Sequence, residues 1–545
     1  MEARHLGLKL KELLQEFVVS QIGDLRQEAF HLALGRLQSS PFSEKALQKL
    51  REDWAQLLPS PASARELPEG QPFFLHLLAQ TLEVMEDPDY RVLVQDKESY
   101  ATGVPVGLDE PLPRVPAVFP PKEKHRKLDD SDYTPFSENY KSAELVAEEM
   151  ENKFKEEEKL GRMYPTTLAA LKAKHPDREV LVASMGAIQK PNGDIRPIHD
   201  ATHHVQLNNR IVFRDQLQYP GPEDAAGVIR EVTETKEAMF SISADIKSAH
   251  RLVKLRSRDH PLICCKASST SDTIWVNKVG TFGVSSASYW WTRLMGTIGR
   301  LVGNAMGTEH NYQLIYVDDL HVVVFGERKF LTLWMMLAAY EALGTPFQYA
   351  KFAGGIEVTF VGFQLDYGRC KMGVTAKRGL WLLNFIKEME AARYTVHMRR
   401  FGEFLGRLAF LARVLVWLKA HLAPLYSWAA ALAKGTVATA PRMVVLVLKF
   451  IAIQLADCSF MYSCHRPVHV LEEQFRTDAK CAQGVVVLGG HHMATGRWFS
   501  LRLEPEQAPY LFKPDGESSW ASAPAELLAT TVHWFFLAME KEEKE

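Results

Sequence analysis

The chain has 545 residues, enough for about three or four domains and for a substantial hydrophobic core. Hydrophobic residues make up 46% and charged residues 24% of the chain, close to the globular average, which excludes disorder over most of its length. The 64 basic and 66 acidic residues give a net charge of −2, so bulk charge alone neither favours nor excludes a nucleic-acid or membrane partner.

No segment predicts secretion or a membrane span. Residues 1–17 place leucines among charges at helical spacing, unlike a signal peptide. The most apolar late run, residues 443–456, contains Lys449 and is shorter than the roughly 20 residues that cross a bilayer. The 6 scattered cysteines suggest no disulfide framework. We expect an intracellular protein, cytoplasmic or nuclear, not secreted and without a membrane partner; the sequence indicates no oligomeric state.

The first two segments carry no catalytic motif. Residues 1–102 are predicted to form amphipathic helices, with Leu10 and Leu14 on one apolar stripe, and their role stays open. Residues 103–177 begin with a proline-rich and charge-rich stretch that is typical of an extended connector rather than a core element. A charged helix follows, and its mixed signs favour a solvated face.

Residues 178–375 change to short strands and turns with helices between them, which predicts an α+β domain. Within it, the stretch QLIYVDDLHVVVF, residues 313–325, predicts a β-hairpin with Asp318 and Asp319 at its tip. The stretch AMFSISADIKSAH, residues 238–250, alternates apolar with polar residues. It predicts a strand that has Asp245 on its polar side.

Three carboxylates in these two elements suggest a metal site. Adjacent aspartates repel each other and cost free energy unless a cation or a shared proton compensates, although an aspartate turn by itself is commonly just solvated. A strand carboxylate beside the hairpin tip completes a cage for two magnesium ions roughly 3.5 to 4 Å apart, the arrangement that activates a 3′-hydroxyl and stabilises a leaving pyrophosphate. Oxygen ligands suit Mg²⁺. We therefore expect two Mg²⁺ ions, with Mn²⁺ as the alternative metal.

Six motifs between residues 189 and 366 follow the order found in reverse transcriptases. QKPNGDIRPIHDATHHVQLNNRI resembles the fingers strand and turn, SADIKSAHRLV the first palm carboxylate motif, and VNKVGTFGVSSAS the nucleotide-pocket segment. YVDD, TPFQYAKFAGG and FVGFQLD resemble the second carboxylate motif, the lysine-bearing loop and the primer-contacting hairpin. KSAHR, KFAGG and the later FRTDAK are most similar to polymerases of DIRS-type and gypsy-type retrotransposons. The resemblance implies a right-hand polymerase fold with fingers, palm and thumb.

The resemblance also assigns roles to individual residues. Lys190 and Arg196 would bind the triphosphate of the incoming nucleotide, since both side chains make charge-assisted contacts to phosphate. Lys351 falls where the family places a candidate general acid for pyrophosphate. The metal ligands would be Asp245, Asp318 and Asp319, with Asp245 and Asp318 the most direct. The floor of the nucleotide pocket would be formed by Phe282 and Gly283.

The pocket departs from the family pattern at three positions. Five residues after Asp245 the family commonly has Phe or Tyr, which excludes a ribose 2′-hydroxyl, whereas this chain has His250. Thr281 and Ser288 stand where prolines are common around the Phe-Gly core of the pocket segment. Because Gly283 remains, we interpret these departures as tuning of the site, and the sugar preference stays open.

Residues 376–465 look like a helical thumb and connection, whose Leu and Trp residues are expected to form its core. Residues 371–434 hold eleven Lys or Arg against three Glu, a surplus of eight positive charges. This surplus is the footprint expected of a contact with a phosphate backbone, and ordinary solvated lysines around a helical core are the alternative.

Residues 472–545 look like a partial RNase H-like α/β segment. FRTDAKCAQGVVVLGG and SAPAELLATTVHWF resemble the first strand and the acidic helix of that family, which makes Asp478 and Glu526 candidate metal ligands. The family needs further carboxylates downstream, and only 19 residues follow Glu526. We therefore expect this segment not to cleave RNA unaided.

These features together predict an RNA-directed DNA polymerase, a nucleotidyltransferase of reverse-transcriptase type. Its partners would be an RNA or DNA template with a primer, and deoxynucleoside triphosphates. Two alternatives stay open. A catalytically degenerate nucleic-acid-binding relic of a mobile element would explain the truncated C-terminal segment and the substituted prolines. An RNA-dependent RNA polymerase shares the palm geometry, and His250 leaves its sugar preference undecided.

Overall fold

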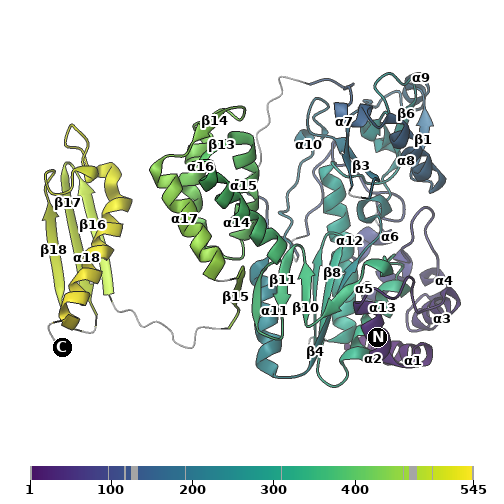
Figure 1. Ribbon diagram of the computed structural model, residues 1–545. Coiled ribbons are helices and arrows are strands. Elements are labelled where there is room, and N and C mark those ends of the chain that lie inside the picture. Colours follow the sequence, from purple (N-terminus) through teal and green to yellow (C-terminus); the bar gives the residue numbers. More distant parts are fainter. Residues whose placement is uncertain are drawn as a thin grey trace. The chain divides into compact units, whose positions relative to one another are not determined.

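A computed structural model describes residues 3–95, 97–115, 118–123, 133–190, 192–307, 310–457, 459–465, 475–493 and 495–542 of the chain (Figure 1). The chain divides into two compact units, residues 1–465 and 466–545. Both units combine helices with strands, so the mixed helix and sheet composition expected from the sequence is confirmed. No helix within the described ranges is long and apolar enough to cross a membrane.

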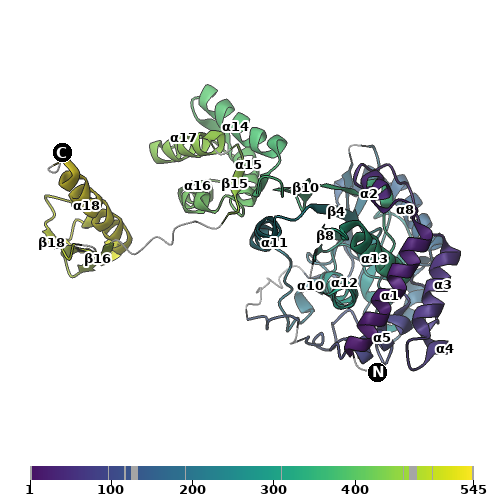
Figure 2. The ribbon, with the colours of Figure 1, turned by 90° about the horizontal axis from the view of Figure 1, so that it is seen from below.

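The N-terminal helices share a core with the central sheet of the first unit. They are α1 (Ala3–Gln21), α2 (Leu25–Ala33), α3 (Glu44–Ala55), α4 (Pro61–Ala64), α5 (Leu75–Val84) and α6 (Tyr90–Val94). The stripe of α1 that faces inward consists of Leu6, Leu10, Leu14 and Val18, all fully buried. It packs on α12 (Ser285–Met306) and α13 (Lys329–Ala342), as Figure 2 shows. The helices α1 to α6 therefore contribute to this unit's core.

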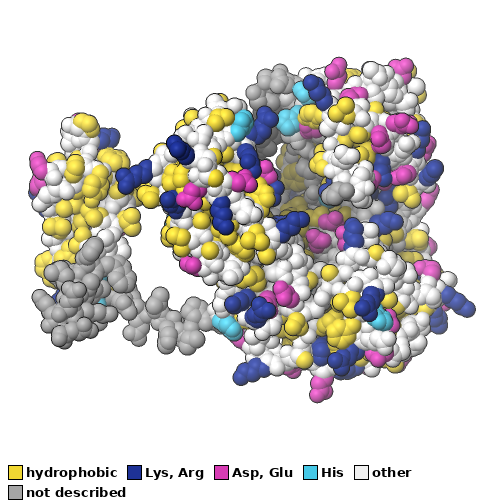
Figure 3. Space-filling model, viewed as in Figure 1, with side chains coloured by type: hydrophobic (Ala, Val, Ile, Leu, Met, Phe, Trp, Pro, Cys, Tyr) yellow, Lys and Arg dark blue, Asp and Glu magenta, His cyan; other side chains and the backbone are white. Residues whose placement is uncertain are grey.

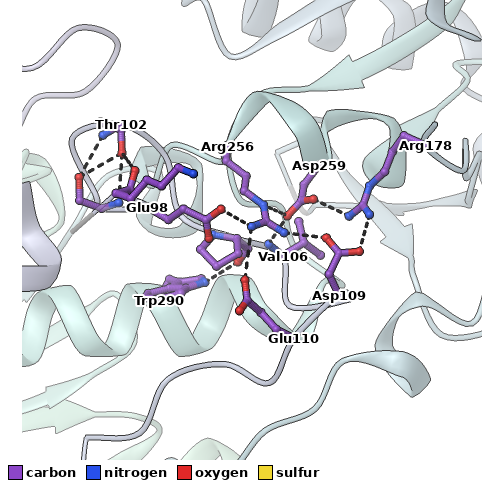
Figure 4. Close-up of polar contacts among 12 residues, drawn as sticks. Glu98, Thr102, Val106, Asp109, Glu110, Arg178, Arg256, Asp259 and Trp290 are labelled. Carbon is purple, nitrogen blue, oxygen red and sulfur yellow. Dashed lines mark hydrogen bonds and ion pairs between the residues drawn. The ribbon is translucent and has the colours of Figure 1, made fainter. Parts of the chain in front are cut away.

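The segment after α6 is extended, but it does not lie outside the core as expected. Val104 and Val106 are fully buried, and Val104 N donates to Lys254 O at 3.0 Å. Apolar residues between the prolines point inward, which explains why a proline-rich stretch packs here. A buried carboxylate also holds the segment. Asp259, which is fully buried, accepts hydrogen bonds from Arg256 Nε at 2.8 Å and from Val106 N at 2.8 Å (Figure 4).

The charged helix is also less solvated than its sequence suggested. Met150 and Phe154 are buried, and the Phe154 ring lies 5.7 Å from that of Trp275. Arg251 Nη2 donates to Glu157 at 2.7 Å. The elements of this region are α7 (Lys141–Glu144), α8 (Ala147–Lys159), β1 (Met163–Thr166), α9 (Leu168–Lys174), β2 (Ser184–Gln189), β3 (Ile195–Asp200), α10 (Leu207–Arg210), β5 (Cys264–Cys265) and β6 (Ile274–Asn277). Strands β2 and β3 form an antiparallel hairpin, and the other three pair in the order β1-β6-β5.

The central sheet has the order β7-β8-β4-β9. Its strands are β4 (Met239–Asp245), β7 (Asn311–Tyr316), β8 (Asp319–Phe325) and β9 (Ala353–Gly355). Because alternate residues of a strand point to opposite faces, Ile242 and Val322 enter the core shared with α12 and α13. Val323 and Phe325 enter a second core on the other face, which contains residues of α11 (Pro222–Thr235).

This second core continues into a sheet and a set of helices. The strands β10 (Glu357–Phe360), β11 (Phe363–Asp366), β12 (Lys371–Val374) and β15 (Met461–Ser463) pair in that order. The helices are α14 (Ala376–Ala391), α15 (Met398–Leu411), α16 (Leu422–Ala430) and α17 (Arg442–Asp457), with a small sheet of β13 (Thr395–His397) and β14 (Val437–Thr439). Leu382, Leu408 and Leu448 are buried as expected. Trp417, by contrast, is 40% exposed and does not belong to the core.

The second unit is an antiparallel sheet covered by one helix. Its strands β16 (Phe475–Ala482), β17 (Val485–His492) and β18 (Trp498–Leu503) pair in sequence order. Helix α18 (Ser522–Glu542) follows, and Ala525 and Ala529 pack in one core with Val486 and Leu488.

Candidate active site

Two aspartates meet across the central sheet. Strands β4 and β8 pair antiparallel, and Asp245, the last residue of β4, stands opposite Asp319, the first residue of β8. Val317 and Asp318 join β7 to β8, so the predicted hairpin is confirmed. Ile246 N donates to Asp318 O at 2.9 Å, which ties the hairpin turn to the end of β4. The fold therefore gathers all three predicted carboxylates at one end of the sheet.

Burial and neighbouring carboxylates raise the pKa of two of these aspartates, Asp318 and Asp319. Burial, together with the charges of Asp318 and Asp245, raises the pKa of Asp319 to about 6. Burial is also the largest cause that raises the pKa of Asp318, with the charge of Asp245 acting in the same direction. Partly buried carboxylates of like charge are unfavourable unless a cation compensates them. The site therefore has the electrostatics of a cation-binding site.

The charges of two basic side chains act on these carboxylates. Lys351, in the short 3-10 turn Tyr349–Lys351, places Nζ 3.1 Å from Oδ1 and 3.2 Å from Oδ2 of Asp245. Gln348 N donates to Asp245 O at 2.9 Å, so the loop that carries Lys351 is anchored to β4. The charges of Lys351 and Arg196 both lower the pKa of Asp318, which otherwise rises through burial. The fold thus brings Arg196, on β3, close enough for its charge to act on Asp318.

Lys190 lies in the turn of the same β2–β3 hairpin, next to the end of β2, and is already paired. Its Nζ lies 2.7 Å from Asp194 Oδ2, and Lys153 of α8 lies 3.2 Å from Asp194 Oδ1. The hydrogen bonds from Lys190 and Lys153 lower the pKa of Asp194 to about 2. Lys190 therefore has to leave this carboxylate before it can bind a phosphate. Pro191 of the predicted turn lies outside the described residues.

A wall beside the β2–β3 hairpin is formed by His250, Phe282 and Gly283. The His250 ring is buried and lies edge to face with Phe282, at 4.8 Å between ring centroids. Burial lowers the pKa of His250 to about 4, so its imidazole is neutral at neutral pH. Gly283 has a φ of +99°, and a Cβ there would lie 1.7 Å from His199 O, so only glycine fits.

Two departures from the family pattern contact each other in this wall. His250 Nε2 lies 3.1 Å from Ser288 Oγ. A proline at position 288 would have no hydroxyl to offer, so the serine and the histidine form a pair. The contact joins residues 38 positions apart, and only the fold could reveal it.

A cavity of about 170 Å³ lies behind this wall. It is lined by residues of α8, β3 and the pocket segment, among them Phe154, Arg196, His199, Arg251, Thr281 and Phe282. Sequence reasoning did not single out His199 or Arg251. Both residues lie within motifs quoted above, His199 in the fingers motif and Arg251 in the first carboxylate motif, and that position was the only signal that could have found them.

The donor chemistry at the sheet end fits magnesium or manganese. The candidate ligands are three carboxylates, which are hard oxygen donors, and burial together with neighbouring negative charge raises the pKa of Asp318 and of Asp319, a situation that a bound cation would relieve. Among the residues that the structure describes, no three His, Cys, Asp or Glu side chains already surround a single point as a formed metal site. Asp245 is instead paired with Lys351.

The RNase H-like candidates are not brought together. Asp478 lies on β16 with an exposed side chain, and the neighbouring Thr477 contacts Thr530 of α18 through their hydroxyls at 3.0 Å. Since successive strand residues point to opposite faces, Asp478 points away from the helix that carries Glu526. The charge of Glu526 instead acts on the thiol of Cys481, whose pKa is raised mainly by burial.

Similarity to known proteins is confined to solved structures. No protein-family model matches the chain, and no curated protein sequence matches it. It is similar to a foamy viral protease-reverse transcriptase dRH in complex with double-stranded DNA, with a TM-score of 0.43 and 13% identity over 88% of this chain and 72% of that one. It is also similar to a foamy viral protease-reverse transcriptase in complex with double-stranded DNA, with a TM-score of 0.43 and 12% identity over 92% of this chain and 87% of that one. Likenesses this low carry no conclusion about activity or substrate.

Proposed function

We propose that the chain is an RNA-directed DNA polymerase of right-hand type, a nucleotidyltransferase from a retroelement. The observation that carries this proposal is the convergence of Asp245, Asp318 and Asp319 at one end of the central sheet. Residues 178–375 would form the fingers and palm, with hairpin β2–β3 in the fingers and the central sheet in the palm. The space-filling view shows acidic side chains, with Lys and Arg nearby, in a hollow of residues 1–465 between α14–α17 and the rest of that unit (Figure 3).

The three carboxylates would hold two divalent ions, Mg²⁺ or Mn²⁺. Bound there, the ions would supply the positive charge that lowers the pKa of a primer 3′-hydroxyl and stabilises a leaving pyrophosphate. Asp245 and Asp318 would be the most direct ligands. The pairing of β4 with β8 sets the separation of their backbones, so the protein contributes chiefly orientation.

The basic residues would bind and orient the incoming deoxynucleoside triphosphate. The charge of Arg196 already acts on Asp318, and its planar guanidinium would contact phosphate oxygens, which it can bind in a bidentate way. Lys190 would exchange its Asp194 partner for the triphosphate. Lys351 Nζ, beside Asp245, is the candidate donor of a proton to the leaving pyrophosphate.

The wall of His250, Phe282 and Gly283 would bound the sugar and base of the nucleotide. Held by Ser288 and packed on Phe282, the His250 ring has a defined position. Its bulk would exclude a ribose 2′-hydroxyl much as an aromatic ring would. Burial keeps the His250 imidazole neutral, which suits a part of the pocket that does not bind a charged group.

Helices α14–α17 would form the thumb that binds the template-primer duplex. The surplus of eight positive charges over residues 371–434 supports a phosphate-backbone contact. Part of this charge is held on aromatic rings: the Arg407 guanidinium lies 4.1 Å from the Trp381 ring centroid and that of Arg378 lies 4.8 Å from the Phe410 centroid. RNA cleavage is not part of the proposal, because Asp478 and Glu526 do not converge.

The proposal is tested by extension of a labelled primer on an RNA template, with Mg²⁺ and with deoxynucleotides and ribonucleotides in parallel. Asp318→Asn should abolish extension and leave duplex binding nearly unchanged, because it removes a ligand charge at nearly constant volume. Asp272→Asn, at an exposed aspartate in a turn, is the matched control and should extend normally. Equal activity of the wild type and Asp318→Asn would contradict the assignment.

The same assay separates the two alternatives. A wild-type protein that is folded and binds duplex without extending any primer would be the degenerate nucleic-acid-binding relic. Incorporation of ribonucleotides in preference to deoxynucleotides would indicate an RNA polymerase instead.

A further inference from the structure

The turn that joins β7 to β8 has an unusual backbone conformation. Val317 has a φ of +54°, in the left-handed region. For a β-branched residue this conformation is a steric outlier, because its Cβ substituents crowd the backbone. Such a conformation persists only where surrounding contacts enforce it. Val317 directly precedes Asp318 and Asp319, so the conformation of this turn sets the direction in which both carboxylates point.

One contact on the turn comes from a fully buried tryptophan. The indole Nε1 of Trp291, on α12, donates to Val317 O at 2.7 Å. Trp291 is 0% exposed and Val317 is half-buried, so the donor of this hydrogen bond is shielded from water. Breaking it would leave the carbonyl of a strained, half-buried residue without this donor. The bond thus acts at a residue whose own backbone conformation is unfavourable.

Helix α12 is also linked to the same hairpin through Tyr219. Tyr219 OH lies 2.9 Å from Thr292 Oγ1, and the Tyr219 ring lies 5.1 Å from that of Tyr316. The helix itself is anchored from the N-terminal region: Arg293 Nη2 lies 2.7 Å from Asp89 Oδ1, and both side chains are buried. The donor of the Trp291 bond therefore sits on a rigid element.

We infer that Trp291 is a positioning residue, whose indole N–H holds Val317 in the left-handed conformation and so orients Asp318 and Asp319. This inference rests on the proposed polymerase function. Trp291 acts through the Val317 backbone. The alternative is that Trp291 only fills space in the core around α12.

Trp290 offers a matched control on the same helix. It is 1% exposed, and its indole Nε1 donates to a backbone carbonyl, Pro105 O, at 2.8 Å. Burial, ring size and hydrogen-bond type are thus alike, but this bond leads to the segment after α6 instead of the hairpin. Substitution by Phe keeps an aromatic ring and removes the N–H at either position.

The kinetic test compares Trp291→Phe with Trp290→Phe in the full chain, at equal folded fraction. Trp291→Phe should lower kcat for primer extension by about tenfold or more and change KM for the deoxynucleotide by less than about twofold, because the carboxylates shift while the nucleotide contacts remain. Trp290→Phe should leave both constants near the wild-type values. Equal losses of kcat in the two variants would mean that Trp291 is only a core residue.

A rescue variant tests the mechanism of positioning. Glycine adopts positive φ readily, so Val317→Gly should let the turn keep its conformation without the indole. The double variant Trp291→Phe/Val317→Gly should therefore regain part of the kcat lost in Trp291→Phe. A double variant no more active than Trp291→Phe would overturn the inference.

The same substitutions give a readout that needs no activity. In thermal unfolding, Trp291→Phe should lower Tm more in the wild-type background than in the Val317→Gly background, because glycine does not need the bond. Additive shifts would overturn the inference even if the chain proves inactive as a polymerase. Val317→Gly alone provides a check should Trp291→Phe fail to fold: an unchanged or higher Tm supports the strained turn, and a clear loss of Tm contradicts it.

Discussion

Lys351 Nζ lies 3.1 Å from Oδ1 and 3.2 Å from Oδ2 of Asp245, so the lysine ammonium group forms an ion pair with the carboxylate on β4 of the candidate site. A divalent ion that binds Asp245 has to compete with this charge. We expect Lys351→Gln to tighten Mn²⁺ binding by roughly two- to fivefold, the range of an exposed ion pair. Calorimetric titration of the protein with Mn²⁺ measures it without reference to turnover.

Lys377→Gln removes an equal charge from an exposed site on α14 and should leave Mn²⁺ affinity unchanged. If Lys351→Gln binds Mn²⁺ no more tightly than this control, Lys351 does not compete for the carboxylate. Loss of Mn²⁺ binding in Asp245→Asn would show that the titration reports this site.

Glu341 makes folding stability depend on pH. It is 8% exposed on α13, and burial raises its pKa to about 7. A carboxyl with a raised folded-state pKa contributes stability that is present below its unfolded pKa and is lost as pH rises through the folded value. The free energy of unfolding should therefore fall between pH 5 and pH 8 by about 1 to 3 kcal/mol from this group.

Glu341→Gln should flatten that dependence, because the amide cannot ionise and still offers an oxygen to the Tyr349 hydroxyl. Urea unfolding at several pH values measures the effect. Glu158→Gln, at an exposed position of α8, is the control and should keep the wild-type slope. An equal slope in the wild type and Glu341→Gln would show that another group is responsible.

His250 should decide the choice between ribose and deoxyribose. Its ring packs 4.8 Å from Phe282, and we propose that its bulk blocks the 2′-hydroxyl. His250→Ala should raise the ratio of ribonucleotide to deoxynucleotide incorporation by about tenfold or more, whereas His250→Phe should keep the ratio low. Ser288→Ala, which removes the contact at His250 Nε2, should shift the ratio in the same direction as His250→Ala but less. A ratio that does not change in His250→Ala would rule out this gate.

The helices α14–α17 should bind duplex through charge. Arg399 and Arg400 begin α15 with exposed side chains, and Arg400 is paired with Glu388 at 2.6 Å. Arg399→Gln should lower the slope of log affinity against log salt by about one. Arg400→Gln should lower it less, because Glu388 already offsets part of that charge. Lys45→Gln on α3 is the control, and an unchanged slope in the double variant Arg399→Gln/Arg400→Gln would contradict the thumb assignment.

The sequence alone determined the local elements of the site. Alternation of apolar and polar residues placed Asp245 on the polar side of a strand, and two apolar runs around Asp318 and Asp319 predicted a hairpin. These inferences succeed because the period of a strand is a local property of the chain. The order of the six motifs likewise needs no structure.

Only the tertiary structure decided how distant segments meet. Trp291 and Val317 are 26 positions apart, and the buried pair Arg293 and Asp89 is 204 positions apart. It also buried the proline-rich segment around Val104 and turned Asp478 away from the helix that carries Glu526. The physical reason is that such contacts depend on which faces pack together once the whole core forms, and no local period encodes that choice.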